Sequence, residues 1–358
     1  MTVLRNERPG LNNITAFIKR LPLPTVIIGA FWVFILIFGI AQGFNLSALL
    51  TDTIRRFGMW GLLVLAMVPS IQSGTGPNFA LPIGICCGLL ALICAIEFGF
   101  TGAGWLLAAV LLAALFASVV GYAYGNLMNA VKGSEMTIAT YTGFSVTYLF
   151  CILWMSLPFQ SRAMGWMLGS GLRNTVELGQ LDGAQIVNDF LSFELLGVTI
   201  PTGMLLVFAG SCLIVWLFFR SRSGVAISAA GMNPMFARAS GLNVDKGRVR
   251  ANMLSTIFAA VGIIIYSQSY GFAALYDAPL MMAFQAVAAI LIGGATAQRS
   301  RIINVVIGTF IFQGLLTNTP PVLNRTFPGT DLTEIMRMVV QNGIILYALT
   351  QVKGGGKD

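Results

Sequence analysis

Few side chains in this 358-residue sequence could carry out covalent or metal chemistry. The chain has no histidine, which excludes histidine-ligated metal sites and Ser-His or Cys-His catalysis. It also has no G-x-x-x-x-G-K-[ST] phosphate loop. We therefore expect no catalytic residue, no cofactor and no metal ion. Its five cysteines all fall in apolar segments: Cys86, Cys87, Cys94, Cys151 and Cys212.

The carboxylates lie at the ends of apolar segments rather than in their middle. Examples are Glu97, Glu135, Asp277 and Glu334. Carriers driven by protons or sodium usually need ionisable groups within the membrane, and an intramembrane enzyme needs an acid, a base or a metal. Both classes are disfavoured, so energy for transport would have to come from elsewhere.

The remaining polar and aromatic side chains in apolar segments suit an uncharged solute. Residues 69–84 are interrupted by glycine and proline, and interrupted apolar segments often line cavities. Asn78 could hydrogen-bond a sugar or nucleoside, and Phe79 could offer it an aromatic face. Helix packing or a structural kink is the alternative explanation for each candidate. The predicted translocation path contains Asn78, Phe79, Tyr141, Phe284 and Gln285.

The amino-acid composition predicts the kind of fold that holds these residues. The chain is 56% hydrophobic and 9% charged, whereas a soluble domain carries about 25% charge. We predict an all-α polytopic membrane protein with a single transmembrane domain. Two glycine pairs, Gly84/Gly88 and Gly121/Gly125, predict closely packed helices. Ten spans are expected, near 25–43, 54–71, 78–98, 104–125, 136–157, 201–219, 251–271, 281–297, 302–318 and 335–352.

Basic residues predict the orientation, because Lys and Arg concentrate in cytoplasmic loops. With both termini inside, 15 of the 21 basic residues face the cytoplasm. The prediction includes a cytoplasmic segment 1–24, an extracytoplasmic loop 158–200 and a cytoplasmic loop 220–250. The cytoplasmic set is Arg5, Arg8, Lys19, Arg20, Lys132, Arg220, Arg222, Arg238, Lys246, Arg248, Arg250, Arg299, Arg301, Lys353 and Lys357, and the other six are Arg55, Arg56, Arg162, Arg173, Arg325 and Arg337.

The loop 220–250 contains the stretch "GMNPMFARASGL", which predicts a short capped helix over 234–240. Asn233 suits the N-cap, Pro234 the first helical position, and Gly241 a left-handed C-terminal cap. Met235, Phe236 and Ala239 could form an apolar patch beside Arg238. Such a helix could transmit force to a soluble partner, or it could simply lie on the membrane surface.

Order and spacing of several motifs give the chain a family resemblance. Gly231, Asn233, Ala237, Gly241 and Leu242 match a loop that reads roughly G-x-N-x-x-A-A-x-x-x-G-I. "AVAAILIGGAT" and "GYAYGNLMNAVKGSEMTIAT" follow the same family's pattern. In about two-thirds of its length the chain resembles permease subunits of bacterial ABC importers for sugars, in the ribose and simple-sugar branch. These are also related to nucleoside and branched-chain amino acid permeases.

The resemblance implies a permease of the bacterial cytoplasmic membrane that imports a sugar or similar hydroxyl-rich solute. It implies three kinds of partner: an ABC-type ATPase with two nucleotide-binding domains, a second permease subunit, identical or not, and an extracytoplasmic solute-binding protein. No nucleic acid is expected. The sequence lacks the family's G-x-D-L-S-x-G segment, which leaves the solute open. The loop would couple to the ATPase through Gly231, Asn233, Pro234, Met235, Phe236, Ala237, Arg238 and Gly241.

The sequence leaves two alternatives to an ABC permease. A channel or facilitator would need no ATPase, and it would conduct solute by itself in liposomes. A membrane enzyme or scaffold is the third possibility, and the shortage of catalytic residue types counts against it.

Overall fold

The computed structural model describes residues 22–159, 161, 164–165, 171–178 and 186–326, with isolated positions between 335 and 346. This part is mostly helical. The helices are α2 (Leu23–Ala41), α3 (Leu46–Leu65), α4 (Met67–Gln72), α5 (Leu81–Glu97), α6 (Gly102–Ala130), α7 (Glu135–Ser156), α8 (Ile186–Asp189), α9 (Thr202–Arg220), α10 (Arg222–Met232), α11 (Pro234–Ala239), α12 (Val244–Tyr270), α13 (Ala278–Ile292) and α14 (Ile302–Thr326). The strands are β1 (Thr175–Glu177), β2 (Phe193–Leu195), β3 (Val198–Ile200) and β4 (Phe272–Ala274).

Among the described residues, seven helical segments are long and apolar enough to cross a membrane. They are α2, α3 with α4, α6, α7, α9, α12 and α14. The third and eighth predicted spans form the shorter apolar helices α5 and α13, of 17 and 15 residues. The tenth predicted span, 335–352, falls mainly outside the described residues. The polytopic helical prediction is confirmed, and helix length and composition support seven of its spans.

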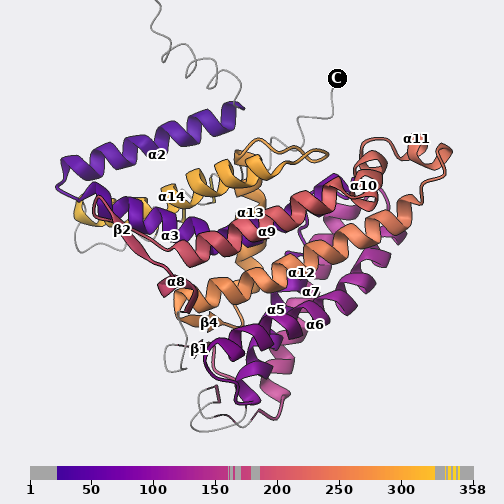
Figure 1. Ribbon diagram of the computed structural model, residues 1–358, viewed down its shortest axis with the longest axis horizontal. Coiled ribbons are helices and arrows are strands. Elements are labelled where there is room, and N and C mark those ends of the chain that lie inside the picture. The colour runs from indigo at the N-terminus through magenta and orange to yellow at the C-terminus, as the bar shows by residue number, and fades with distance from the viewer. Residues whose placement is uncertain are drawn as a thin grey trace, which may run out of the picture.

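Helix α12 runs through the interior of the bundle, against α5 and α6 (Figure 1). A Cβ added at Gly88 would lie 2.3 Å from the backbone oxygen of Ala260, and one at Gly125 would lie 2.8 Å from the Cα of Val249. Gly84 and Gly121 make similar close approaches to α12. Both glycine pairs therefore allow the close packing predicted for them, and both use it against the same helix.

Burial distinguishes inner from outer helices. In its most apolar stretch α12 is 67% buried, whereas α6 is 22% buried and α7 17%. The exposed face of α6 carries large apolar side chains at helical spacing, including Leu107, Leu111 and Leu115. An apolar face of this size needs lipid or another apolar protein surface against it.

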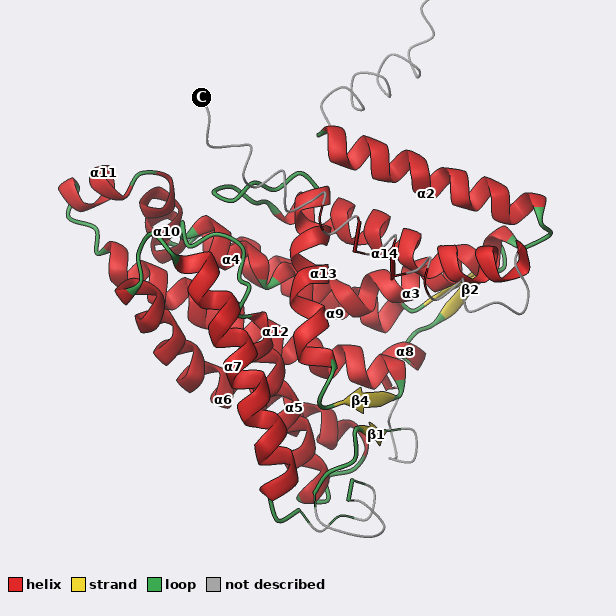
Figure 2. Ribbon diagram, turned by 180° about the vertical axis from the view of Figure 1, so that it is seen from behind, coloured by secondary structure: helices red, strands yellow, loops and turns green. Residues whose placement is uncertain are grey.

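Loops gather at two opposite ends of the bundle (Figure 2). At one end β1 pairs with β4, and β2 pairs with β3 in a hairpin. At the other end lie α10, α11 and the turn between α6 and α7, where Lys132 Nζ is 2.6 Å from Asp245 Oδ1. We call these the strand-bearing end and the α11 end. Loops that the charge pattern predicts to share a side thus contact one another.

Candidate functional site

Helix α11 projects from the α11 end, and its own residues define both of its ends (Figure 1). Asn233 Oδ1 accepts a hydrogen bond of 3.0 Å from Phe236 N, and Pro234 occupies the first turn. After Ser240, Gly241 adopts φ +78°. The helix is one residue shorter than predicted, and its N-cap and its glycine lie where the sequence places them.

The C-terminal end of α11 is locked by two backbone hydrogen bonds. Gly241 N donates to Arg238 O, and Leu242 N donates to Ala237 O at 2.9 Å. This double pattern around a left-handed glycine satisfies carbonyls that a helix end leaves unpaired. Ala237 is fully buried and packs with Ala230, Leu242 and Val244. The small helix is therefore rigidly attached to α10 and α12.

The opposite face of α11 is apolar and exposed. Met235 is 83% exposed and Phe236 66%, and Met232 at the end of α10 is also exposed. Arg238 lies beside them, with its Nη2 3.8 Å from Asp245 Oδ1. Ala239 is exposed as well. A rigid knob that shows two large apolar side chains and a cation is suited to docking into a groove of another protein.

Gly231 lets α10 lie directly against the end of α4. A Cβ at Gly231 would lie 2.1 Å from Gln72 O, so the two backbones touch. Ser228 Oγ donates to Gln72 Oε1 at 2.8 Å, and Gln72 Nε2 donates to Ser300 O at 2.8 Å. Gln72 thus connects the segment bearing α11 with the turn between α13 and α14.

Ion pairs fix the first turns of α12 to the α6–α7 turn. Arg248 donates to Glu135 in a largely buried pair, and Lys132 pairs with the exposed Asp245. Asn243 Oδ1 also caps α12 by accepting from Lys246 N at 2.9 Å. These contacts link the segment after α11 to α6 and α7.

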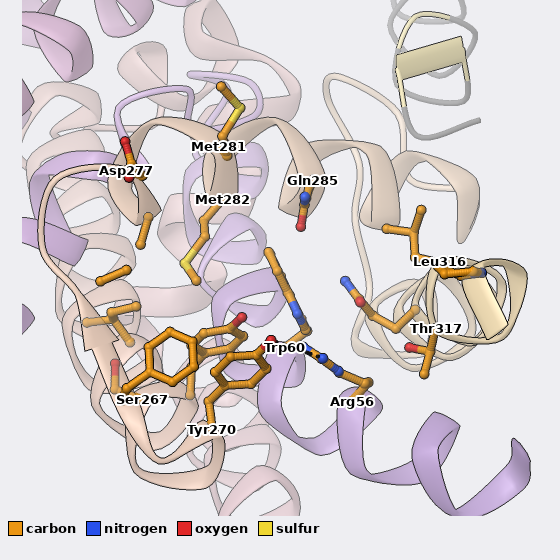
Figure 3. A pocket seen from close by; sticks show the side chains of 17 residues that line it. Arg56, Trp60, Ser267, Tyr270, Asp277, Met281, Met282, Gln285, Leu316 and Thr317 are labelled. Carbon is orange, nitrogen blue, oxygen red and sulfur yellow. Dashed lines mark hydrogen bonds between the residues drawn. The ribbon is translucent and has the colours of Figure 1, made fainter. Parts of the chain in front are cut away.

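A cavity of about 530 Å³ opens at the strand-bearing end, between α3, α12, α13 and α14 (Figure 3). One side of it is aromatic. The rings of Tyr266 and Tyr270 stack with centroids 5.6 Å apart, and Trp60 meets Tyr266 edge-on at 5.6 Å. We call this space the aromatic cavity. Its size and its mixture of aromatic and few polar groups are typical of small-molecule sites.

Polar groups reach the aromatic cavity from four helices, and α12 contributes Ser267. The Arg56 guanidinium lies 4.7 Å from the centre of the Tyr270 ring, and Gln285 extends from α13 into the space (Figure 3). Gln313 and Thr317 line it from α14. Gln313 Nε2 is buried without a hydrogen-bond partner among the described residues.

A second cavity, of about 590 Å³, lies at the α11 end beside the turn between α13 and α14. Gln72 and Ser228 line it together with Arg299, Arg301 and Asn304, and we call it the turn cavity. Both cavities lie along the α13–α14 pair. Roughly 13 Å of α13 separates Gln285 from Gly294, at 1.5 Å per residue.

The chain was compared with known proteins. The family described as branched-chain amino acid transport system / permease component matches residues 33–349. The galactofuranose transporter permease protein YtfT of Escherichia coli (strain K12) is 23% identical over 347 residues, covering 94% of this chain and 91% of that protein. The galactose/methyl galactoside import permease protein MglC of Haemophilus influenzae is 26% identical over 161 residues, 44% of each chain. The family match covers most of the sequence.

The chain belongs to this family of permease components. It is accordingly a transporter subunit rather than an enzyme, and a multi-pass protein of the inner membrane.

The five residues of the predicted translocation path lie in different surroundings. Gln285 lines the aromatic cavity. Phe79 and Phe284 contact each other, with ring centres 6.0 Å apart, and neither of them lines that cavity. Tyr141 is 65% exposed on α7. The structure therefore brings Phe79 and Phe284 together and leaves Tyr141 apart.

Asn78 lies in a buried polar cluster and outside the cavities described above. Its Nδ2 donates to Ser255 Oγ at 2.9 Å, and its Oδ1 accepts from Tyr124 and from Ala80 N, each at 3.0 Å. These bonds leave little capacity for a solute. Asn78 therefore links the turn before α5 to α6 and α12.

Sequence reasoning missed most of the aromatic cavity. Arg56 and Trp60, and likewise Tyr266 and Tyr270, are aromatic or polar pairs spaced by four residues within apolar helices. Such a pair lies on one face of a helix. That spacing is the signal that could have identified the lining, although it does not say which faces meet.

Proposed function

We propose that this permease is the membrane subunit of an ATP-driven importer for a sugar or a similar hydroxyl-rich solute. Two relatives support the solute class, since their names specify galactofuranose and galactose or methyl galactoside. The lining of the aromatic cavity supports it too. Aromatic rings can cover the C–H face of a sugar, while Gln285, Gln313 and Arg56 offer hydrogen bonds to its hydroxyls.

The proposed assembly has two permease subunits, one ATPase with two nucleotide-binding domains and an extracytoplasmic solute-binding protein. The α11 end faces the cytoplasm, as do both termini, and the aromatic cavity opens to the outside. This orientation is supported by the excess of basic residues at the α11 end. The exposed Tyr141 reaches the path only if a second subunit packs against α7.

The observation that carries the proposal is the geometry of α11. The exposed apolar side chains of α11 would be unfavourable at a surface that stays in contact with water. The helix is nevertheless held in place by its caps, by the buried Ala237 and by the ion pair of Arg238 with Asp245. In the proposed mechanism it seats in a groove of the ATPase. Gln72 then relays its movement to the turn cavity, because its side chain binds both α10 and the α13–α14 turn.

The solute would pass from the aromatic cavity to the turn cavity along α13 and α14. Between the two, residues 286–292 of α13 are buried. Transport would need this packed stretch to open and close in alternation, which discrete rearrangement of packed helices permits. The buried stretch also counts against an open channel, the alternative reading of the sequence.

Substitution of α11 tests the proposal. Phe236→Glu combined with Arg238→Glu should abolish co-purification with the cognate ATPase and lower solute uptake at least tenfold. The conservative Phe236→Leu keeps an apolar side chain and should retain both activities. Both side chains are largely exposed, so the melting temperature should change little.

Unchanged ATPase association and uptake in the double variant would reject the coupling role. Liposomes that contain the permease alone provide a second test. ATP-independent solute flux there would instead support the facilitator.

A further inference from the structure

A third cavity, of about 330 Å³, lies between the start of α10 and the start of α12. Three cationic side chains line it: Arg222, Lys246 and Arg250. Its lining also includes the apolar Ile227 and Leu242 and the polar Ser223. We call it the basic cavity. It is separate from both cavities along α13 and α14.

The three cations of the basic cavity are uncompensated in the described part of the chain. None of them has a carboxylate within 4.0 Å there. The nearby carboxylates are already engaged, because Asp245 pairs with Lys132 and Arg238, and Glu135 pairs with Arg248. Three like charges around one concave space repel one another, and a bound anion would relieve this repulsion.

The preceding helix locates the cavity relative to the membrane. α9 exposes Leu213, Ile214 and Leu217 and ends at Arg220, whose guanidinium lies 4.0 Å from the centre of the Trp216 ring. A tryptophan and an arginine that close an exposed apolar helix are typical of the boundary between hydrocarbon and headgroups. Arg222 follows two residues later, so a membrane boundary at Trp216 and Arg220 would bring lipid phosphates to its level.

We propose that the basic cavity binds the phosphate of an anionic phospholipid from the leaflet at the α11 end. Arg222, Lys246 and Arg250 would contact the phosphate, while Ile227 and Leu242 would contact the apolar part of the lipid. Basic sites between helices at the cytoplasmic surface suit such headgroups. The lipid would bridge α10 and α12, the two helices that hold α11, and so stabilise the position of α11.

Lipid retention tests this directly. The purified permease in mild detergent is mixed with phosphatidylglycerol or phosphatidylcholine, and bound lipid is counted by native mass spectrometry. Phosphatidylglycerol should be retained preferentially. Lys246→Gln with Arg250→Gln should weaken its binding at least tenfold, since each interfacial cation contributes roughly a fivefold factor. The matched control, Arg299→Gln with Arg301→Gln, removes the same charge at the same end and should retain the lipid.

Several results would overturn the proposal. Equal retention of the two lipids, or equal loss in both double variants, would show that general charge rather than the cavity is responsible. Full displacement by millimolar inorganic phosphate would assign the site to a soluble anion. Cross-linking of Lys246 in the unsubstituted permease to a carboxylate of the ATPase would assign the basic cavity to the protein partner, if the variant Lys246→Gln with Arg250→Gln also lost no lipid. None of these readouts depends on transport, so failure here leaves the proposed function untouched.

Discussion

The two ends of α12 differ in what their polar and aromatic side chains contact. At the α11 end, Asn243 caps the helix and Arg248 binds Glu135. At the strand-bearing end, the helix contributes Tyr266 and Tyr270 to a cavity whose other side holds an amide without a partner, on Gln313. The first end is held by a cap and a largely buried ion pair, and the second faces a cavity.

This difference matches the different requirements of force transmission and solute passage. A lever must move as one piece, so its local bonds should be made within the protein. A transport pathway must also release its solute. It should therefore bind the solute through only a few hydrogen-bonding groups. The same helix can meet both requirements because its ends are about 40 Å apart, at 1.5 Å per residue over its 27 residues.

The largest effect is expected where α13 and α14 separate the two cavities. A Cβ at Gly308 would lie 1.9 Å from Ala289 O, and one at Gly293 would lie 1.9 Å from Asn304 O. Gly308→Ala must force the helices apart, and we expect it to destabilise the permease by about 3 kcal/mol or more. Thermal unfolding in detergent would measure this.

Gly210→Ala is the matched control for that substitution. Gly210 lies in α9 with nothing within 4 Å of its added Cβ. Its substitution should leave stability equal or slightly higher. If Gly308→Ala were equally harmless, α13 and α14 would not be closely packed, and the barrier between the cavities would lose its basis.

A smaller effect should distinguish the buried from the exposed ion pair at the α11 end. Glu135→Gln leaves the Arg248 guanidinium largely buried without its anion, at a cost of about 2 kcal/mol. Asp245→Asn removes an exposed anion and should cost less than about 1 kcal/mol, and this cost should shrink at high salt while the Glu135→Gln cost changes little. Equal costs for the two substitutions would contradict the view that burial makes the Arg248–Glu135 pair the stronger of the two.

The sequence could predict α11 because its signals are local. An asparagine, a proline and a glycine at fixed offsets specify where a short helix begins and ends, whatever lies around it. The glycine pairs predicted close packing for a similar reason. They could not identify α12 as the common partner of α5 and α6, since contact between distant helices depends on the whole bundle.

The aromatic cavity could not be predicted from the sequence because four helices contribute to it. Trp60, Tyr266, Gln285 and Gln313 come from α3, α12, α13 and α14 and meet only in the folded chain. Asn78 is a case in which the pattern and the observed contacts point to different roles. An asparagine in an interrupted apolar segment suggests a cavity, yet its partners Tyr124 and Ser255 lie on other helices and bury it.

The smallest effect concerns the unpaired groups of the aromatic cavity. Gln285→Ala with Gln313→Ala removes two neutral hydrogen-bonding side chains, each worth about 1 kcal/mol. Apparent affinity for the transported sugar should fall about tenfold or more in reconstituted proteoliposomes with the ATPase and binding protein. ATPase association should be unchanged, because both residues lie far along the bundle from α11.

Gln268→Leu is the matched control, since the Gln268 amide is also buried without a partner among the described residues but does not line the cavity. Replacing an unsatisfied amide by an apolar group of similar size should leave solute affinity unchanged and should not destabilise the fold. Gln268→Leu could instead weaken apparent affinity for the sugar as much as Gln285→Ala with Gln313→Ala does. The loss would then come from disturbed packing of the strand-bearing end and not from contacts with the solute. The contrast between the two ends of α12 would then have no bearing on where the solute binds.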